Sequence, residues 1–136
     1  MTKNFLVLIL ALVALLVCCP LSTGADDRDI SPKVVMTTPS NGATDVDPAL
    51  SKITVTFNKP MLDKSWSWSY EDKSSFPQMA GQPYYSDEGT TCVLPVRWEP
   101  GMRYIIWINT AKFKNFKDKK GGPAEPYKLT FATSRK

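Results

Sequence analysis

The residue types that most enzymes use for catalysis are scarce in this chain. It has no histidine, and so it lacks the commonest general base, the usual catalytic triad and most zinc sites. Its 13 acidic residues are scattered, and no pair of carboxylates stands out as the acid and base of a glycosidase. We therefore expect a protein that is not an enzyme and needs no cofactor, with a small secreted enzyme or inhibitor kept as an alternative.

Two other places have residues that can bind an ion or react. Asp45 and Asp47 lie near Asn41 in a turn, where oxygen ligands suit calcium, but these residue types are also ordinary turn formers. Cys92 alternates with apolar residues such as Leu94, which predicts a small buried residue rather than a reactive thiol. The sequence favours a structural role in both places, and no metal site is expected.

The most concentrated charge lies in KFKNFKDKK, residues 112–120, with five lysines, two phenylalanines and one acid. Such a stretch can bind an anionic polymer on which the aromatic rings stack. Alternatively it is a solvated loop, in which Phe113 and Phe116 anchor one helical turn on the core. The candidate patch for a partner consists of Lys112, Phe113, Lys114, Lys117, Lys119, Lys120 and Trp98, a tryptophan that precedes a Pro-Gly turn and is expected to be exposed. An envelope polysaccharide or another envelope protein would suit it, whereas the small net charge does not indicate nucleic acid.

The stretch SWSWSY, residues 65–70, alternates serine with aromatic residues. In a strand this pattern places Trp66, Trp68 and Tyr70 on one face and the serines on the other. Exposed rings would form a platform for a sugar, whereas buried rings would each remove about 150–250 Å² from water. A small domain without disulfides needs that contribution, so we expect Trp66 or Trp68 in the core and Tyr70 at its rim. Trp107, on a later strand, should be at least half buried.

A signal for export precedes the domain. Residues 1–25 contain a basic start, an apolar run of 15 residues (5–19) and small residues before a cleavage position after Ala25 or the residue before it. This order is typical of a secretory signal peptide. The run is shorter than the about 20 residues of a membrane span, although an uncleaved anchor is an alternative, as is lipid attachment at Cys18 or Cys19. We expect an exported protein that is periplasmic, secreted or at the cell surface, with membrane contact only under those two alternatives.

Residues 26–32 read as a polar tail and residues 33–134 as one folded domain. Without residues 1–25, the chain has 111 residues, a net charge of +3 and one cysteine, so no intrachain disulfide can form. Seven strands with period-two patterns are expected: 33–38, 52–57, 65–70, two arms of a hairpin over 83–96, a central strand over 103–109 and a last one over 127–133. Pro95 indicates that its strand lies at an edge or carries a bulge. These elements predict an all-β, Ig-like antiparallel β-sandwich.

One local feature sharpens this prediction. Tyr104 follows Glu99, Pro100 and Gly101 at the start of a strand, and this arrangement resembles the tyrosine corner of Ig-like sandwiches. In that corner the ring packs inside the domain, and the hydroxyl bonds back to a nearby backbone group.

The stretch PSNGATDVDPALSKITVTFNKPM, residues 39–61, resembles the opening of a bacterial Ig-like domain family, the one named for the surface-layer protein SbsA. The matching positions are Pro39, Gly42, Ala43, Val46, Phe57, Pro60 and Met61, and later Pro100, Gly101, Tyr104, Phe131 and Thr133. The resemblance covers about residues 33–134 and implies an Ig-like fold without catalytic residues, used as a spacer or accessory module. Together with the export signal, it implies a non-catalytic binding or structural module at the bacterial cell envelope. A carbohydrate- or cell-wall-polymer-binding module that uses the basic and aromatic patch is the alternative.

Overall fold

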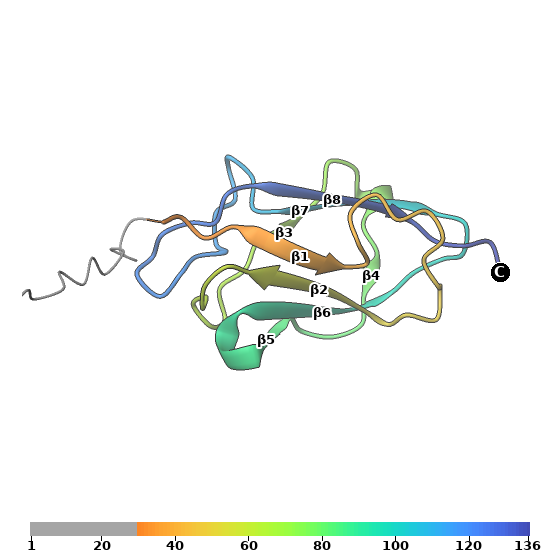
Figure 1. Cartoon of the computed structure of the whole chain (residues 1–136). Coiled ribbons are helices and arrows are strands. Elements are labelled where there is room, and N and C mark those ends of the chain that lie inside the picture. Colours follow the sequence, from red (N-terminus) through yellow and green to blue (C-terminus); the bar gives the residue numbers. More distant parts are fainter. Residues whose placement is uncertain (1–29) are drawn as a thin grey trace, which may run out of the picture.

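The computed structural model describes residues 30–136, so the expected signal peptide and most of the polar tail lie outside the described residues. Eight strands form two antiparallel sheets that pack face to face (Figure 1). The first sheet has the order β1-β2-β6-β4, with β5 also paired to β6, and the second has the order β3-β7-β8. The strands are β1 (Val34–Thr38), β2 (Lys52–Phe57), β3 (Trp68–Ser69), β4 (Gln78–Met79), β5 (Tyr84–Ser86), β6 (Thr91–Arg97), β7 (Arg103–Ile108) and β8 (Tyr127–Ala132). The predicted all-β, Ig-like sandwich is confirmed.

Helical structure within the described residues is limited to two short 3-10 turns, η1 (Lys73–Ser75) and η2 (Asp87–Gly89). No helix in this part of the chain has the length and apolar character needed to cross a membrane. The strand over 103–109 was expected to be central, and β7 does lie between β3 and β8. The two-residue strand β4 was not predicted, since a segment this short has no periodicity to detect.

Pro95 marks neither an edge strand nor a bulge in the pairing of β6 with β2, whose register is unbroken, so that prediction is wrong. Strand β6 is internal, with β2 on one side and both β4 and β5 on the other. Pairing with β5 ends at Val93, and pairing with β4 begins at Val96. Pro95 therefore occupies the gap between two partner strands, where its missing N–H group leaves no ladder bond unmade.

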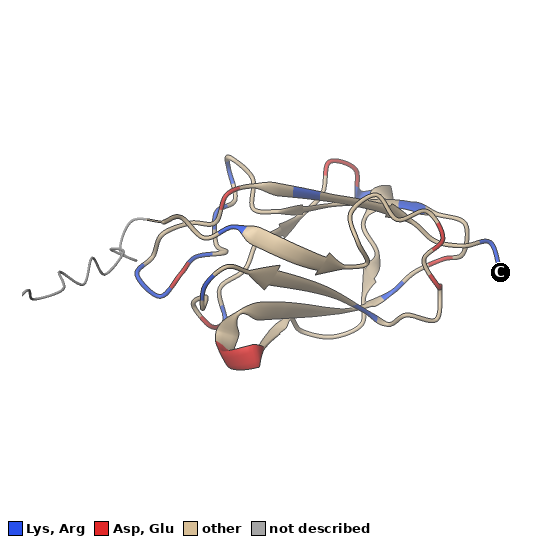
Figure 2. Cartoon of the chain, in the orientation of Figure 1, with Lys and Arg blue, Asp and Glu red and all other residues tan. Residues whose placement is uncertain are grey.

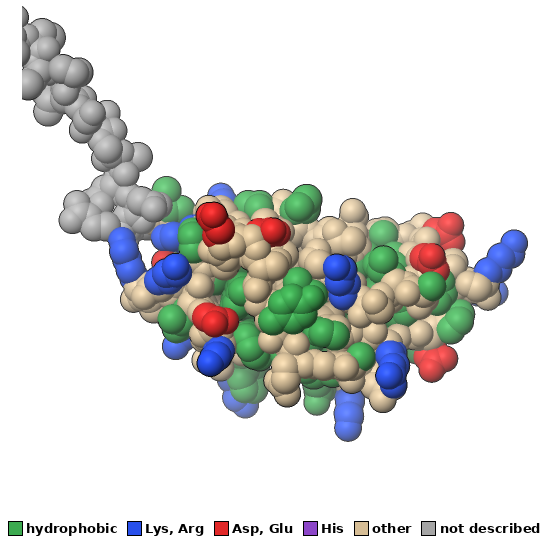
Figure 3. Space-filling model, turned by 90° about the horizontal axis from the view of Figure 1, so that it is seen from below, with side chains coloured by type: hydrophobic (Ala, Val, Ile, Leu, Met, Phe, Trp, Pro, Cys, Tyr) green, Lys and Arg blue, Asp and Glu red, His purple; other side chains and the backbone are tan. Residues whose placement is uncertain are grey.

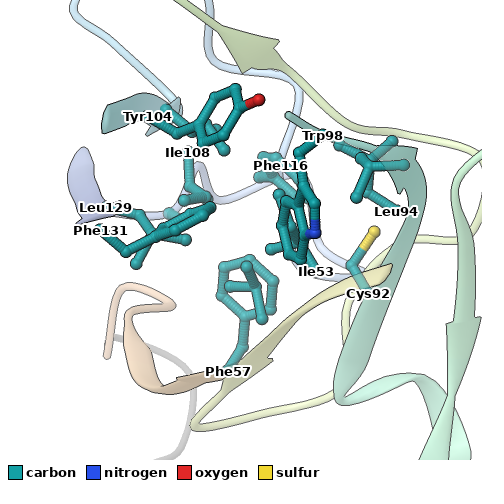
Figure 4. Close-up of a cluster of buried hydrophobic side chains, with 14 of the residues drawn as sticks. Ile53, Phe57, Cys92, Leu94, Trp98, Tyr104, Ile108, Phe116, Leu129 and Phe131 are labelled. Carbon is teal, nitrogen blue, oxygen red and sulfur yellow. The ribbon is translucent and has the colours of Figure 1, made fainter. Parts of the chain in front are cut away.

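The core fills the space between the two sheets (Figure 4). On β2, the buried Ile53, Val55 and Phe57 alternate with Lys52, Thr54 and Thr56, as the period-two pattern predicts. The core also contains Cys92, Leu94 and Val96 from β6, Ile106 and Ile108 from β7, and Leu129 and Phe131 from β8. The domain is therefore held together by packing between alternating side chains of both sheets.

Trp98 belongs to this core, so the expectation that it is exposed is wrong. Its side chain is 8% exposed, its ring lies 5.3 Å from that of Phe131, and its indole Nε1 donates to the carbonyl of Pro48 at 3.0 Å. Trp98 continues the inward alternation of Leu94 and Val96 beyond the end of β6. This parity, rather than the turn that follows, decides which way the ring points.

The tyrosine corner is present. Tyr104 is 3% exposed, and its hydroxyl oxygen accepts a hydrogen bond from the backbone N–H of Glu99 at 2.7 Å. Thr133, just beyond β8, donates its hydroxyl to the carbonyl of Glu99 at 2.6 Å and accepts from the Met102 N–H at 3.0 Å. The turn before β7 is therefore fastened to the end of β8.

A short segment after β1 runs parallel to the end of β8. The amides of Gly42 and Val46 donate to the carbonyls of Thr130 and Ala132, at 2.6 and 3.0 Å. Val46 and Thr133 form a parallel bridge. The described chain enters at one end of the sandwich and its C-terminus lies at the other (Figure 1).

Candidate functional site

A groove opens at one edge of the sandwich, where the two sheets part. It has a volume of about 500 Å³ and lies between edge strand β3 of the second sheet and strand β4 of the first. Its lining is mostly aromatic and apolar: Trp66, Ser67, Trp68, Ser69, Tyr70, Met79, Pro83 and Phe113. Viewed from below, hydrophobic side chains gather across the middle of the molecule between separate lysine and arginine side chains (Figure 3). The groove is the strongest candidate for a binding site among the described residues.

Strand β3 forms one wall of the groove. Trp68 stands opposite the fully buried Ile108 in the register with β7, so its ring points between the sheets. The ring packs edge-on against Phe116 at 5.3 Å between centroids. The tryptophan is nonetheless only partly buried, because β3 is the last strand of its sheet.

The other two aromatic residues of this stretch flank Trp68. Trp66 is also partly buried and packs on Tyr85 at 6.3 Å between ring centroids, while the Tyr85 hydroxyl donates to the carbonyl of Ser65 at 3.2 Å. Tyr70 is 50% exposed and contacts Phe76 at 5.7 Å. Tyr70 thus lies at the rim as predicted. Both tryptophans pack on the core with one side and face the groove with the other, so the same two residues belong to the edge of the core and to the groove wall.

A loop after β7 supplies the end of the groove that contains Phe113. Asn109, fully buried, holds this loop with its side chain: its Nδ2 donates to the carbonyls of Phe116 and Ala124 at 2.9 and 3.0 Å, and its Oδ1 accepts from the Phe116 N–H at 2.9 Å. Phe116 is fully buried as predicted, whereas Phe113 is 49% exposed. The helical turn expected across these two phenylalanines is absent, because Asn109 provides the backbone bonds that a turn of helix would have made.

The basic stretch does not form one continuous patch. Lys112 and Lys114 lie on either side of Phe113 in sequence, and the Lys112 ammonium is 5.4 Å from the centre of the Phe113 ring. Lys117, Lys119 and Lys120 belong to a separate turn that returns at Pro123. Figure 2 shows the lysines of this loop at the end of the sandwich where the described chain begins. Of the residues in the candidate patch, Phe113 lines the groove and Lys112 lies over the Phe113 ring. Trp98 lies in the core, away from this patch.

Asp118 anchors that separate turn. It is 6% exposed and accepts hydrogen bonds from the backbone N–H groups of Lys120 and Gly122 and from the Lys59 ammonium, at 3.0, 2.9 and 3.1 Å. Burial acts to raise the pKa of Asp118, but the bonds from Gly122, Lys59 and Lys120 together lower it below its ordinary value. The Lys59 ammonium is therefore paired with the Asp118 carboxylate and helps to hold this turn.

Neither Cys92 nor the turn aspartates show the features of a reactive or metal-binding site. Burial raises the pKa of the Cys92 thiol to about 12, which leaves the thiol protonated and unreactive at neutral pH. Asp47 and Asn41 use side-chain oxygens to accept from the N–H groups of Ala49 and Thr130, both at 2.9 Å. Over residues 30–136, no three histidine, cysteine or acidic side chains come together as a metal site.

Met79 and Pro83 line the groove and were not anticipated as site residues. Met79 belongs to β4, opposite Val96 of β6, and is 47% exposed. Its place beside β3 depends on how the two sheet edges face each other, which no local sequence pattern encodes. The alternation in SWSWSY was the available signal for this wall, but we expected its tryptophans in the core and placed the candidate patch on other residues.

Comparison with known proteins identifies the fold family. The family described as bacterial Ig-like domain matches residues 28–133. The chain belongs to this family. Such domains are typically non-catalytic.

The solved structures that resemble this bacterial Ig-like domain share little of its sequence. A crystal structure of the S-layer protein rSbsC has 19% sequence identity over 79% of this chain and 14% of that one, with a TM-score of 0.47. A crystal structure of the N-terminal part of the bacterial S-layer protein SbsC has 19% identity over 77% of this chain and 24% of that one, with a TM-score of 0.48. This chain thus corresponds to a small part of either protein. No curated protein is significantly similar to it.

Proposed function

We propose that the protein is an exported, non-catalytic Ig-like module of the bacterial cell envelope that binds a partner in the groove beside β3. Membership of the bacterial Ig-like domain family and the secretory pattern in residues 1–25 support the location. The observation that carries the binding role is the groove itself, an apolar opening of about 500 Å³ between two sheet edges. Exposed apolar surface gathered in a groove is a common property of interaction sites.

The exposed side chains of the groove set the energy available for binding. Tyr70, Phe113 and Met79 are 50%, 49% and 47% exposed. Covering the free half of one aromatic ring removes about 100 Å² from water, which contributes about 2.5 kcal/mol at 25 cal/mol per Å². Two rings and a methionine therefore contribute about 6–7 kcal/mol, which is less than the about 8 kcal/mol of a micromolar complex even before the cost of association, so a partner must also make polar or backbone contacts.

A cell-wall polymer or polysaccharide is the second candidate partner. Lys112 and Lys114 next to the groove favour an anionic polymer, because their charges add attraction to the stacking surface of Phe113. Replacing Lys112, Lys114 and Lys117 by glutamate should then release the protein from isolated cell walls. Unchanged sedimentation with the walls would remove this candidate.

Sedimentation with isolated envelope fractions tests the proposed function. The double variant Tyr70→Ala, Phe113→Ala should reduce the bound fraction by about tenfold or more, because it removes both exposed rings of the groove. Tyr84→Ala is the matched control: Tyr84 is also 50% exposed, but it stands opposite Val93 on the outer face of the first sheet. Equal binding by the wild type and the double variant would refute the groove as the site, and a wild type that binds no fraction would refute the binding role.

A further inference from the structure

We infer that the groove binds an extended segment of a partner protein, which adds as a strand to the open edge of β3. This inference rests on the proposed binding role and names the class of partner. The segment we expect alternates apolar side chains and carries a carboxylate near the end that lies beside Lys112 and Lys114. Four features of the described residues lead to it.

The first feature is the unused backbone of β3. The Asn109 N–H donates to the carbonyl of Ser67 at 3.2 Å, and Ser69 stands opposite Trp107 in the register. In an antiparallel pair, hydrogen-bonded and non-bonded positions alternate, so Ser67 and Ser69 direct their backbone groups toward β7 and Trp68 directs its own away. No strand of the described chain lies on that outer side, because β3 is the last strand of its sheet.

The neighbours of Trp68 extend this free edge. Neither Trp66 nor Tyr70 exchanges a backbone hydrogen bond with another residue in the range 30–136. A row of unpaired N–H and C=O groups is a template for another strand. An added strand would satisfy these groups with its own backbone, which is how edge strands recognise extended peptides in general.

The second feature is the position of the groove relative to that edge. The side chain of Trp68 points between the sheets and Tyr70 lies at the rim, while Met79 of β4 and Pro83, just before β5, line the groove with them. A strand placed beside β3 would continue the second sheet over the groove. Every second side chain of the added strand would then enter the groove and contact these residues.

The third feature is charge at one end of the groove. Asn115 bonds to the Ser67 hydroxyl at 2.9 Å, which places the loop that carries Lys112 and Lys114 at the start of β3. Among the described residues, neither lysine forms an ion pair. A carboxylate at the corresponding end of the bound segment would complement them, whereas a basic segment would be repelled.

The fourth feature separates a peptide from a glycan. A sugar needs polar side chains to bond its hydroxyls, yet the Ser67 hydroxyl already accepts from the Asn115 N–H, and Ser69 follows the inward-pointing Trp68 on its strand, so its side chain is directed to the opposite face of the sheet. The other polar side-chain groups of the lining are the Tyr70 hydroxyl and the indole N–H groups of Trp66 and Trp68, and the Trp68 N–H is buried without a hydrogen-bond partner among the described residues. The polar groups still free along this wall are mainly backbone groups, and a peptide backbone complements these best.

Selection from random peptides tests the inference without knowledge of the natural partner. A phage library of random twelve-residue peptides is selected against the protein purified from cells that express the full chain. We expect selected peptides with alternating apolar residues and an acidic end, and a loss of affinity of at least about tenfold in the Tyr70→Ala, Phe113→Ala variant. Tyr84→Ala should bind as the wild type does.

Two further measurements test strand addition itself. Methylation of alternate backbone nitrogens on the selected peptide should weaken binding about tenfold or more, because it removes the donors that face β3. Hydrogen exchange at the Trp68 amide should slow on binding. A synthetic peptide that binds in the groove but tolerates the methylation and leaves Trp68 unprotected would overturn the inference.

The outcomes also separate this inference from the proposed function. If no selected peptide depends on Tyr70 and Phe113, but envelope fractions bind in a way that does, the groove binds another class of molecule such as a glycan. The proposed function would then stand and the strand inference would fall. If neither peptides nor envelope fractions bind, both are refuted.

Discussion

Replacing Asn109 by alanine should destabilise the domain by at least about 3 kcal/mol. The side chain makes three hydrogen bonds to backbone groups of the loop that ends the groove, at 2.9, 3.0 and 2.9 Å. Each such bond contributes about 1 kcal/mol net. The three bonds alone therefore account for about 3 kcal/mol.

Two further effects raise the cost. The backbone groups left without a partner belong to Phe116 and Ala124, which are 0% and 3% exposed, so water replaces the lost bonds poorly. Asn109 also has a φ of 59°, in the left-handed region that asparagine tolerates and alanine resists by about 1 kcal/mol. Asn109→Gly loses the same bonds without this strain, so it should be about 1 kcal/mol more stable than Asn109→Ala.

Urea unfolding monitored by tryptophan fluorescence measures both variants. Asn115→Ala is the control, because Asn115 is exposed in the same loop and only its backbone atoms form hydrogen bonds; it should change stability by no more than about 0.5 kcal/mol. If Asn109→Ala cost no more than the control, the side chain would not be what holds the loop. Phe113 would then need another anchor, and the groove would lose its support at this end.

Three other predictions follow from buried polar groups. Tyr104→Phe leaves the N–H of Glu99 without its acceptor and should cost about 1–3 kcal/mol in unfolding experiments, whereas Tyr127→Phe, whose hydroxyl has no hydrogen-bond partner within residues 30–136, should be nearly neutral. The pKa of Asp118 is lowered in the folded chain, so its contribution to stability is present above the ordinary value of 3.8 and is lost as the pH falls through the lowered pKa. Asp118→Asn should therefore flatten the fall in stability between about pH 5 and pH 2, and an unchanged slope would refute this role. The Cys92 thiol, with a pKa of about 12, should not react with a thiol reagent at pH 8 until the protein unfolds; rapid labelling of the folded chain would contradict its burial.

Strand alternation allowed most of the sandwich to be predicted from the sequence. The pattern in KITVTF corresponds to β2 without correction, and Tyr104 makes the bond that its place after the Pro-Gly turn predicts. These features depend on neighbours in sequence, whose side chains alternate between the two faces. Trp98 was misplaced because a turn signal was given more weight than its parity with Val96.

The groove could be predicted only in part. Trp66, Trp68 and Tyr70 were singled out from their spacing, but whether they are core or surface depends on where the opposite sheet ends. Met79 reaches the groove through a two-residue strand, and no local signal indicated it. The helical turn expected around Phe113 failed for a similar reason: Asn109 bonds to residues up to 15 positions away, and propensity over a short window cannot include such a contact.

The parallel pairing beside β8 has a mechanical consequence. The described chain enters at one end of the sandwich and leaves at the other (Figure 1), so tension on its two ends would pull Gly42 and Ser134 in opposite directions along the same axis. The bonds from Gly42 and Val46 to β8, and the bond from the Ser134 N–H to Val46 at 2.8 Å, lie across that axis. They would be loaded together in shear and would have to break at once, whereas bonds that open from one end break singly. The fold is therefore suited to resist stretching along this axis.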